Sequence, residues 1–435
     1  AACGGARPAE LRRMSIEAPA EPSSGHRTLL ADGTVVLVRR LGPGDREAVL
    51  RLHAELPADD RYLRFFSAGA AGFDKLADLV VSDASVAVGA FRAEELIGGA
   101  HYRREAPGTA PEVAVAVRHD QQHRGVATLL LEYLVAVARG EGVTRLDADV
   151  LVANQDMSAV LRDLGLPVRS TPLSDVREIV MGLPGVGTTT ASERYAEAVL
   201  DRSIRSDVAS LRAVLAPRSV VVVGAGSRPD SVGRLVLRQL VDGGFAGSIH
   251  LVSRHDSGLP GVRSYRSIDD LEDSVDLAVV CVPAAAVPDV ARRCGAHGVR
   301  GLLVITSGVS TDPRLRGELL SAVARYGMRL IGPNCVGFVN TDPAVRLRAS
   351  FGAAGNAGHV GLAVQSGGVA IALTTALNRL GLGVSTAVST GDALDVNGDD
   401  LLAWWDADEQ TTAAVLYLES LARPRRFARL ARRLA

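Results

Sequence analysis

The sequence has almost no net charge. Its 48 basic residues are balanced by 49 acidic ones, which leaves a formal net charge of −1. A nucleic-acid binder needs a basic face to neutralise phosphates, so this balance argues against that class of partner. Aromatic residues are also scarce, at 4% of 435 residues, so the cores must be aliphatic. With 47% hydrophobic residues, burial can still offset chain entropy, which excludes wholesale disorder.

Cysteine is scarce, and long apolar runs are missing. The four cysteines Cys3, Cys281, Cys294 and Cys335 form no CxxC pair, so we expect no disulfide framework and a reducing cytoplasm. The scattered histidines lead us to expect no bound metal. No apolar run approaches the ~20 residues of a membrane span, and no secretory signal pattern opens the chain. These absences predict a cytoplasmic protein without a membrane partner.

The chain length predicts two to four domains. Residues 1–28 are rich in Ala, Pro, Ser, Gly and Arg without periodicity and predict a disordered tail. We place a first domain at 29–183 and a linker with an amphipathic helix at 184–213. Two further domains follow at 214–342 and 343–435. We also expect the chain to be truncated, because the terminal helix 423–434 has no strand after it in this second α/β series.

Two hydrophobic patterns distinguish these domains. The pattern of the first domain predicts an α+β fold with a mixed sheet. Its elements include a helix at 45–56 capped by Asp45, a hairpin at 86–103, a central strand at 112–117 and a long helix at 126–140. From Ser219 onward, continuous β-branched strands alternate with helices, which is typical of a doubly wound, Rossmann-like sheet. The segment from residue 343 predicts a second, flavodoxin-like α/β domain.

The first chemical pattern is a polar, glycine-containing turn between a strand and a long helix. Outward N–H groups and the helix dipole at such a turn suit a pyrophosphate, although a tight turn that merely needs small residues explains the spacing as well. The residues of this turn are Gln122, His123, Arg124, Gly125, Val126 and Ala127.

The segment EVAVAVRHDQQHRGVATLLLEYLVAVAR, the later NQDM and DLGL, and RYLRFF at 61–66 resemble the GNAT N-acetyltransferase family, in its bacterial protein lysine acetyltransferase form. The resemblance implies that the turn binds acetyl-CoA and that the central strand splays to admit the thioester. It places Glu112 where the family has a general base; the alternative is an exposed residue at a strand start. Asn154 matches an asparagine beside the pantetheine arm, and it also suits a helix N-cap.

The second pattern is a strand followed by the loop GAGSRPDSVG at 224–233, whose last glycine lies too late for a dinucleotide motif. This loop, DLAVVCVP, LIGPNCVG, QSGG and YLE resemble the CoA-binding and ligase regions of NDP-forming acyl-CoA synthetases and the succinyl-CoA synthetase alpha subunit. The resemblance implies a CoA site and remnants of a phosphate site. The CoA residues are Gly224, Ser227, Ser231, Val232, Gly233, Asn334 and Cys335; the phosphate and ligase residues are Gln365, Ser366, Gly367, Gly368 and Glu419.

Three functions follow from these resemblances. The first is a transferase that acetylates a protein lysine, for instance on an acyl-CoA synthetase, while its second half senses CoA or acyl-CoA. The second is the front part of a bifunctional acetate–CoA ligase, since the family's phosphohistidine and ATP-grasp regions are not among these 435 residues. The third is a CoA sensor without activity. We expect CoA and acetyl-CoA as ligands and a homo-oligomeric assembly.

Overall fold

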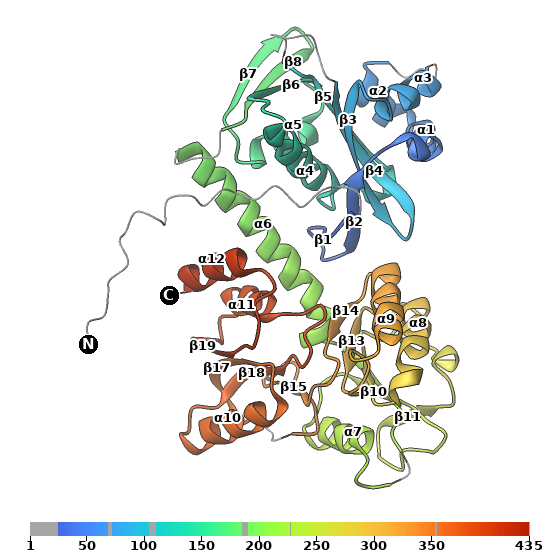
Figure 1. The fold of residues 1–435 in the computed structure, drawn as a ribbon, viewed down its shortest axis with the longest axis vertical. Helices are drawn as coiled ribbons and strands as arrows, with labels where there is room; N and C mark the ends of the chain where they lie inside the picture. The colour runs from blue at the N-terminus through green and yellow to red at the C-terminus, as the bar shows by residue number, and fades with distance from the viewer. Residues whose placement is uncertain are drawn as a thin grey trace, which may run out of the picture. The chain divides into compact units, whose positions relative to one another are not determined.

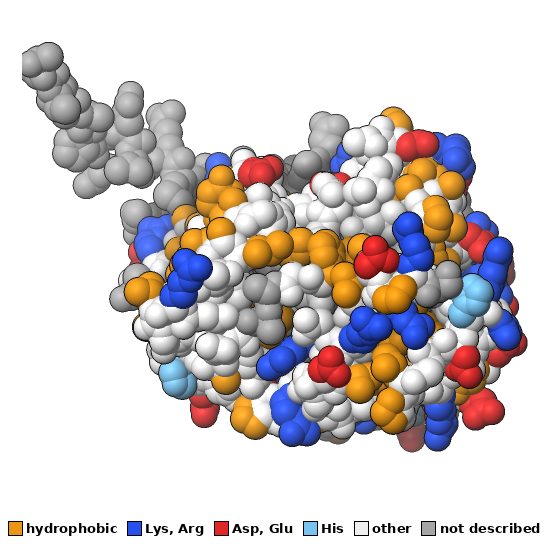
Figure 2. Space-filling view, turned by 90° about the horizontal axis from the view of Figure 1, so that it is seen from below, with side chains coloured by type: hydrophobic (Ala, Val, Ile, Leu, Met, Phe, Trp, Pro, Cys, Tyr) orange, Lys and Arg blue, Asp and Glu red, His pale blue; other side chains and the backbone are white. Residues whose placement is uncertain are grey.

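The structure is a computed structural model that describes residues 25–67, 72–103, 110–184, 190–226, 228–352 and 355–434. The chain divides into two compact units. The N-terminal unit holds the segment up to Leu30 and Val36–Arg202, and the C-terminal unit holds Ala31–Val35 and Ser203–Ala435. Each unit is described by itself. Basic and acidic side chains are interspersed over the face seen in Figure 2.

Among its described residues, the N-terminal unit has a five-stranded and a three-stranded sheet, which a parallel bridge joins into the predicted mixed arrangement, together with α1 to α5 and the first part of α6 (Thr190–Leu215) (Figure 1). The first sheet has the order β1-β2-β3-β4-β5 and the second the order β6-β8-β7. Their strands are β1 (His26–Leu29), β2 (Val35–Arg40), β3 (Ser85–Arg92), β4 (Glu95–Arg103), β5 (Val113–Val117), β6 (Arg145–Leu151), β7 (Val168–Leu173) and β8 (Val176–Gly182). The helices are α1 (Arg46–Ala54), α2 (Ala58–Phe65), α3 (Phe73–Val80), α4 (Val126–Gly140) and α5 (Gln155–Asp163).

This layout confirms the predicted α+β fold and the hairpin of β3 and β4. Two details differ from the expectations. Strand β1 begins at His26, so residues 26–28 are not part of a disordered tail; residues 1–24 lie outside the described part. Asp45 precedes α1 without capping it through its side chain. Its carboxylate instead accepts hydrogen bonds from Arg39 and from the Gly42 N–H, because the arginine fork offers a stronger, bidentate partner.

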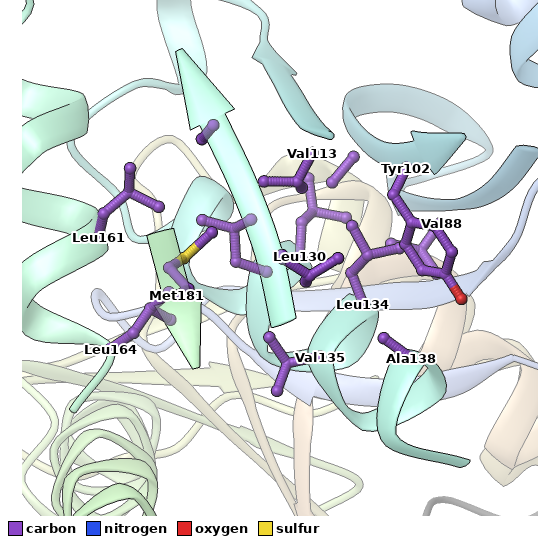
Figure 3. Close-up of a cluster of buried hydrophobic side chains, with 14 of the residues drawn as sticks. Val88, Tyr102, Val113, Leu130, Leu134, Val135, Ala138, Leu161, Leu164 and Met181 are labelled. Carbon is purple, nitrogen blue, oxygen red and sulfur yellow. The ribbon is translucent and has the colours of Figure 1, made fainter. Parts of the chain in front are cut away.

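Helix α4 forms the centre of the N-terminal core. Its sequence places aliphatic residues three and four apart, so Leu130, Leu131, Leu134 and Val135 are all fully buried. Figure 3 shows Leu130 and Leu134 of α4 between Tyr102 and Val88 of the first sheet on one side and Met181 of the second sheet on the other. Each such burial contributes about 1.5–3 kcal/mol, so α4 holds the two sheets on one core.

The two sheets meet at a single point. Strands β5 and β6 run parallel, but their one bridge pairs Glu112 with Asp147, supported by the Asp147 N–H donating to the Pro111 carbonyl at 3.0 Å. Beyond it, within the part of the chain that the structure describes, β5 pairs with β4 and β6 with β8, and not with each other. The predicted splay of the central strand is therefore present, and it opens a notch between β5 and β6.

The C-terminal unit begins with a six-stranded parallel sheet of order β11-β10-β9-β12-β13-β14. It confirms the predicted doubly wound fold, although the short edge strand β11 was not anticipated. The strands are β9 (Ser219–Val223), β10 (Ser248–Val252), β11 (Val262–Tyr265), β12 (Leu277–Val280), β13 (Gly301–Val304) and β14 (Arg329–Ile331), with helices α7 (Val232–Asp242), α8 (Val287–Ala296) and α9 (Pro313–Tyr326).

A second sheet of order β16-β15-β18-β17-β19 follows. Strand β15 pairs antiparallel with both β16 and β18, so this sheet begins at Gly337, before residue 343. Its strands are β15 (Gly337–Asn340), β16 (Leu347–Ser350), β17 (Ala357–Val364), β18 (Val384–Ser389) and β19 (Ala413–Tyr417), with helices α10 (Gly367–Arg379), α11 (Gly398–Asp406) and α12 (Pro424–Leu434). The predicted linking helix is α6 (Thr190–Leu215).

A buried cluster of charged side chains joins α6, β14, α11 and α12 within the C-terminal unit. Arg329 is at its centre, donating to Asp395 at 2.9 Å and to the Ser210 hydroxyl at 2.6 Å. Burial opposes its charge, but the surrounding carboxylates outweigh burial and raise the Arg329 pKa. We call this set the buried ion cluster: Asp207, Arg329, Asp395, Asp399, Asp400, Arg423 and Arg426.

Candidate functional site

The N-terminal unit contains a cavity of about 440 Å³ at the notch between β5 and β6. Its walls come from β5, β6, the first turn of α4, the start of α5 and the helix α2. Of the predicted residues, this cavity gathers Glu112, Gln122, His123, Gly125, Val126, Ala127 and Asn154. It therefore unites residues that are up to 42 positions apart in the sequence.

The glycine turn forms the mouth of this cavity at the N-terminus of α4. Gly125 has a φ of +83° and His123 a φ of +57°, left-handed values that a glycine adopts without strain. The first N–H groups of α4 have no acceptor within the helix, and they carry the positive end of its dipole. Arg124 differs from the expectation. Its guanidinium donates to the Gln121 side chain, and within the described residues it is not part of the cavity wall.

A carboxylate from α2 fixes this turn. Asp60 accepts a hydrogen bond from the Gln122 amide at 2.8 Å and lies 3.0 Å from the His119 imidazole Nδ1. Asp60 was not predicted as a site residue, and its position 62 residues before Gln122 explains why spacing could not reveal it. The contact ties α2 to the α4 turn across the cavity.

Glu112 and Asn154 lie at different parts of the cavity wall. Glu112 is exposed and occupies the bridge where β5 and β6 part, so its carboxylate stands at the closed end of the notch. Asn154 caps α5, accepting from the Met157 N–H at 3.0 Å. Both expected roles for Asn154 are compatible, since it caps the helix and lines the cavity.

Sequence reasoning missed a basic group on α2. Arg64 lines the cavity, and its Nε is buried without a hydrogen-bond partner among the described residues. Burial lowers the pKa of Arg64 to about 10, against the attraction of Glu112. Burial also lowers the pKa values of His53 and His101, to about 4 and about 3. RYLRFF was the available signal, but it indicated a family and no role for the arginine.

The C-terminal unit contains a second cavity, of about 590 Å³, between its two sheets. It gathers seven of the predicted CoA and phosphate residues, namely Val232, Asn334, Cys335, Gln365, Ser366, Gly367 and Glu419. Asp392 and Thr306 belong to the wall as well and were not predicted. Asn334 has a φ of +60° and donates to Asp392 at 3.1 Å, which orients both side chains.

The predicted glycine loop has a packing role in this unit. A Cβ at Gly233 would lie 2.8 Å from the Gly224 carbonyl oxygen, and one at Gly224 would lie 2.8 Å from Val282. Both glycines are therefore required for the close contact of β9, α7 and the β12 end. Ser231 donates to the Arg228 carbonyl at 2.9 Å. Within the described residues, Gly224, Ser231, Gly233 and Gly368 are not part of the cavity wall, and Ser227 lies outside the described residues.

The phosphate-site residues do come together. The Gln365 side-chain oxygen accepts from the N–H groups of Glu419 and Ser420, which fixes the β19 end beside the N-terminus of α10. Burial raises the pKa of the Cys335 thiol to about 12, so this predicted CoA residue is a neutral thiol near pH 7. Burial and the neighbouring Cys335 raise the pKa of the Cys281 thiol, on the same wall, to about 12.

Both cavities fit CoA or acetyl-CoA by the same criterion. Each has a helix N-terminus on its wall, from α4 in one and from α7 and α10 in the other, and helix N-termini bind phosphate groups. In the described ranges, no group of three or more His, Cys, Asp or Glu side chains could hold a metal ion. No helix there is long and apolar enough to cross a bilayer.

Three family models match the chain in order. The acetyltransferase (GNAT) family matches residues 53–166, a CoA-binding domain matches 218–341, and the succinyl-CoA ligase-like flavodoxin domain matches 357–435. Domains of the first two kinds use acetyl-CoA and CoA. The cavity of the N-terminal unit thus lies largely in the GNAT match, and the second cavity lies in the other two.

Two curated relatives each match about half of the chain. An ADP-forming acetate–CoA ligase of Methanocaldococcus jannaschii is 36% identical over 228 residues, covering 52% of this chain and 32% of that protein. The alpha subunit of ADP-forming acetate–CoA ligase I of Pyrococcus furiosus is 36% identical over 234 residues, covering 51% and 50%. The chain thus spans a third to a half of these relatives.

The crystal structure of the GNAT domain of S. lividans PAT is 28% identical, covers 38% of this chain and 99% of that one, and has a TM-score of 0.35. Taken together, the family matches and relatives show that the chain carries a GNAT acetyltransferase domain fused to CoA-binding and succinyl-CoA ligase-like flavodoxin domains related to the NDP-forming acyl-CoA synthetases.

Proposed function

We propose that the chain is an acetyl-CoA-dependent N-acetyltransferase that modifies lysine side chains of proteins. The observation that carries the proposal is the placement of Glu112 at the closed end of the notch, with the α4 N-terminus at the cavity mouth. The α4 N-terminus suits the phosphates of CoA, and the Glu112 carboxylate suits proton transfer. Acetyl-CoA would supply the activated acetyl group.

The residues of the chain would divide the work of the reaction. The N–H groups of Gln122–Ala127 bind and orient the pyrophosphate. The Asn154 amide lies further along the same wall. An acceptor amine is protonated near neutral pH and must lose its proton before attacking a thioester. The Glu112 carboxylate accepts that proton, directly or through water.

The C-terminal unit would bind CoA or acyl-CoA in the 590 Å³ cavity and adjust the transferase activity. A specific observation also favours the alternative, the front part of an acetate–CoA ligase. Gln365, Ser366 and Glu419 are arranged around one helix N-terminus, as a phosphate site requires. We propose a cytoplasmic, homo-oligomeric protein, with an acyl-CoA synthetase as one candidate acceptor.

The transferase proposal is tested by substituting Glu112 with Gln. We expect acetyl-CoA to bind as before, because the substitution leaves the N–H groups of the α4 turn unchanged, while acetyl transfer to a lysine peptide falls by about 10²–10⁴-fold. Glu55→Gln is the matched control, since Glu55 is exposed and lies off the cavity wall. Transfer by Glu112→Gln at the wild-type rate, with the same pH–rate profile, would remove Glu112 from the mechanism.

A further inference from the structure

Arg64 places a half-buried cation, with its Nε fully buried, in the cavity that Glu112 also lines. It lies on α2, lines the cavity and interacts electrostatically with Glu112. In the described part of the chain, no carboxylate forms an ion pair with it, and its Nε has no hydrogen-bond partner. Its guanidinium carbon lies 4.9 Å from the Phe65 ring centroid, a cation–π contact that satisfies no N–H group.

The other ionisable groups around Arg64 do not balance its charge. His53 and His101 are buried, and their lowered pKa values of about 4 and about 3 make both neutral at pH 7. Glu112 is the one carboxylate whose charge acts on Arg64, and the proposed reaction protonates it. A buried N–H group without an acceptor is costly, so a carboxylate entering the cavity would gain a charge-assisted hydrogen bond from Arg64.

The same helix presents two aromatic side chains at the surface. Tyr62 is 46% exposed and Phe66 is 42% exposed, and they lie one turn apart on α2. Phe66 also lines the cavity, so the aromatic pair continues from the cavity rim to the outside. Exposed aromatic pairs beside a cavity are typical of surfaces that bind protein partners.

We propose that α2 is the acceptor-docking element and that Arg64 is the subsite for a carboxylate next to the acceptor lysine. The inference rests on the proposed function and narrows its substrates to lysine segments with an adjacent acidic residue and an apolar side chain. An acyl group with its own carboxylate is the competing source of the anion. A peptide fits better, because it can reach Arg64 and the exposed pair of Tyr62 and Phe66 together.

The test uses the full chain and three synthetic peptides with Glu, Gln or Lys beside one lysine. We expect the wild type to acetylate the Glu peptide with a kcat/KM about tenfold above that of the Gln peptide, the scale of one charged hydrogen bond, and to use the Lys peptide least. Arg64→Gln should bring the ratio of the kcat/KM values for the Glu and Gln peptides to about one. Arg51→Gln, an exposed arginine on α1, should keep the preference.

Peptide binding measured by calorimetry separates this inference from the proposed function. If no peptide is acetylated but the Glu peptide still binds about tenfold more tightly in an Arg64-dependent manner, the subsite stands and the lysine transferase does not. If peptides are acetylated without regard to the neighbouring charge, the subsite is refuted. A preference for succinyl-CoA over acetyl-CoA that disappears in Arg64→Gln would assign the guanidinium to the acyl group and overturn the proposal. The wild-type comparison remains decisive if Arg64→Gln fails to fold.

Discussion

Replacing Arg329 with Met should destabilise the C-terminal unit more than any exposed arginine does. The Arg329 side chain is 7% exposed and lies within 2.9 Å of Asp395, 3.5 Å of Asp400 and 3.9 Å of Asp207. The buried ion cluster has four carboxylates and three guanidinium groups, so the substitution leaves four carboxylates with two. Removing one partner from a buried ion pair costs about 3–5 kcal/mol.

For a unit of this size, each kcal/mol lowers the midpoint by about 2–4 °C, so we expect the transition of the C-terminal unit to fall by roughly 6–20 °C. Differential scanning calorimetry of the full chain at pH 7 provides the measurement. Arg314→Met is the control, because Arg314 is 66% exposed and its pair with Glu318 contributes at most about 1 kcal/mol. Equal shifts of the transition temperature in the two variants would refute the view that the buried carboxylates need Arg329 as their partner.

Two further predictions concern protonation and ligand sites. Burial and the neighbouring Asp400 raise the Asp207 pKa to about 6, so the folded state binds more protons than the unfolded chain between pH 4 and 6. As the pH rises through this window, the free energy of unfolding of the wild type should therefore fall relative to that of Asp207→Asn, by up to about 3 kcal/mol. If urea unfolding gives the same difference between the two proteins at pH 4.5 and at pH 7.5, the raised pKa is contradicted. Calorimetry with CoA should find two sites, one weakened by Ala127→Glu and the other by Val232→Glu, because each puts a carboxylate at a helix N-terminus that would otherwise bind phosphate. Loss of a single common site in both variants would show that one cavity alone binds CoA.

The sequence was sufficient for elements with strong local patterns. Helix α4 spans the predicted 126–140 because its apolar residues recur at helical spacing and a glycine precedes it. The antiparallel pair β15 and β16 was missed, since four-residue strands carry too little alternation to be distinguished from loop. The site shows the same division. The predicted residues of the α4 turn are contiguous, and five of the six line the cavity. Asp60 and Arg64 reach the same cavity from a distant segment, which spacing does not encode.

The parting of β5 and β6 has a consequence for how sequence change affects ligand recognition. Within the described residues, β5 is the last strand of its sheet, so its outer edge leaves main-chain N–H and C=O groups available along the cavity. An extended ligand with amide groups can pair with that edge irrespective of which side chains β5 carries. Substitutions at Ala114, Val115 and Val117 that keep β5 extended should therefore be tolerated better than substitutions at Val113 and Ala116, which are buried in the core. A proline would delete a donor. Ligand pairing along this edge would therefore depend on the backbone conformation of β5 more than on its side chains.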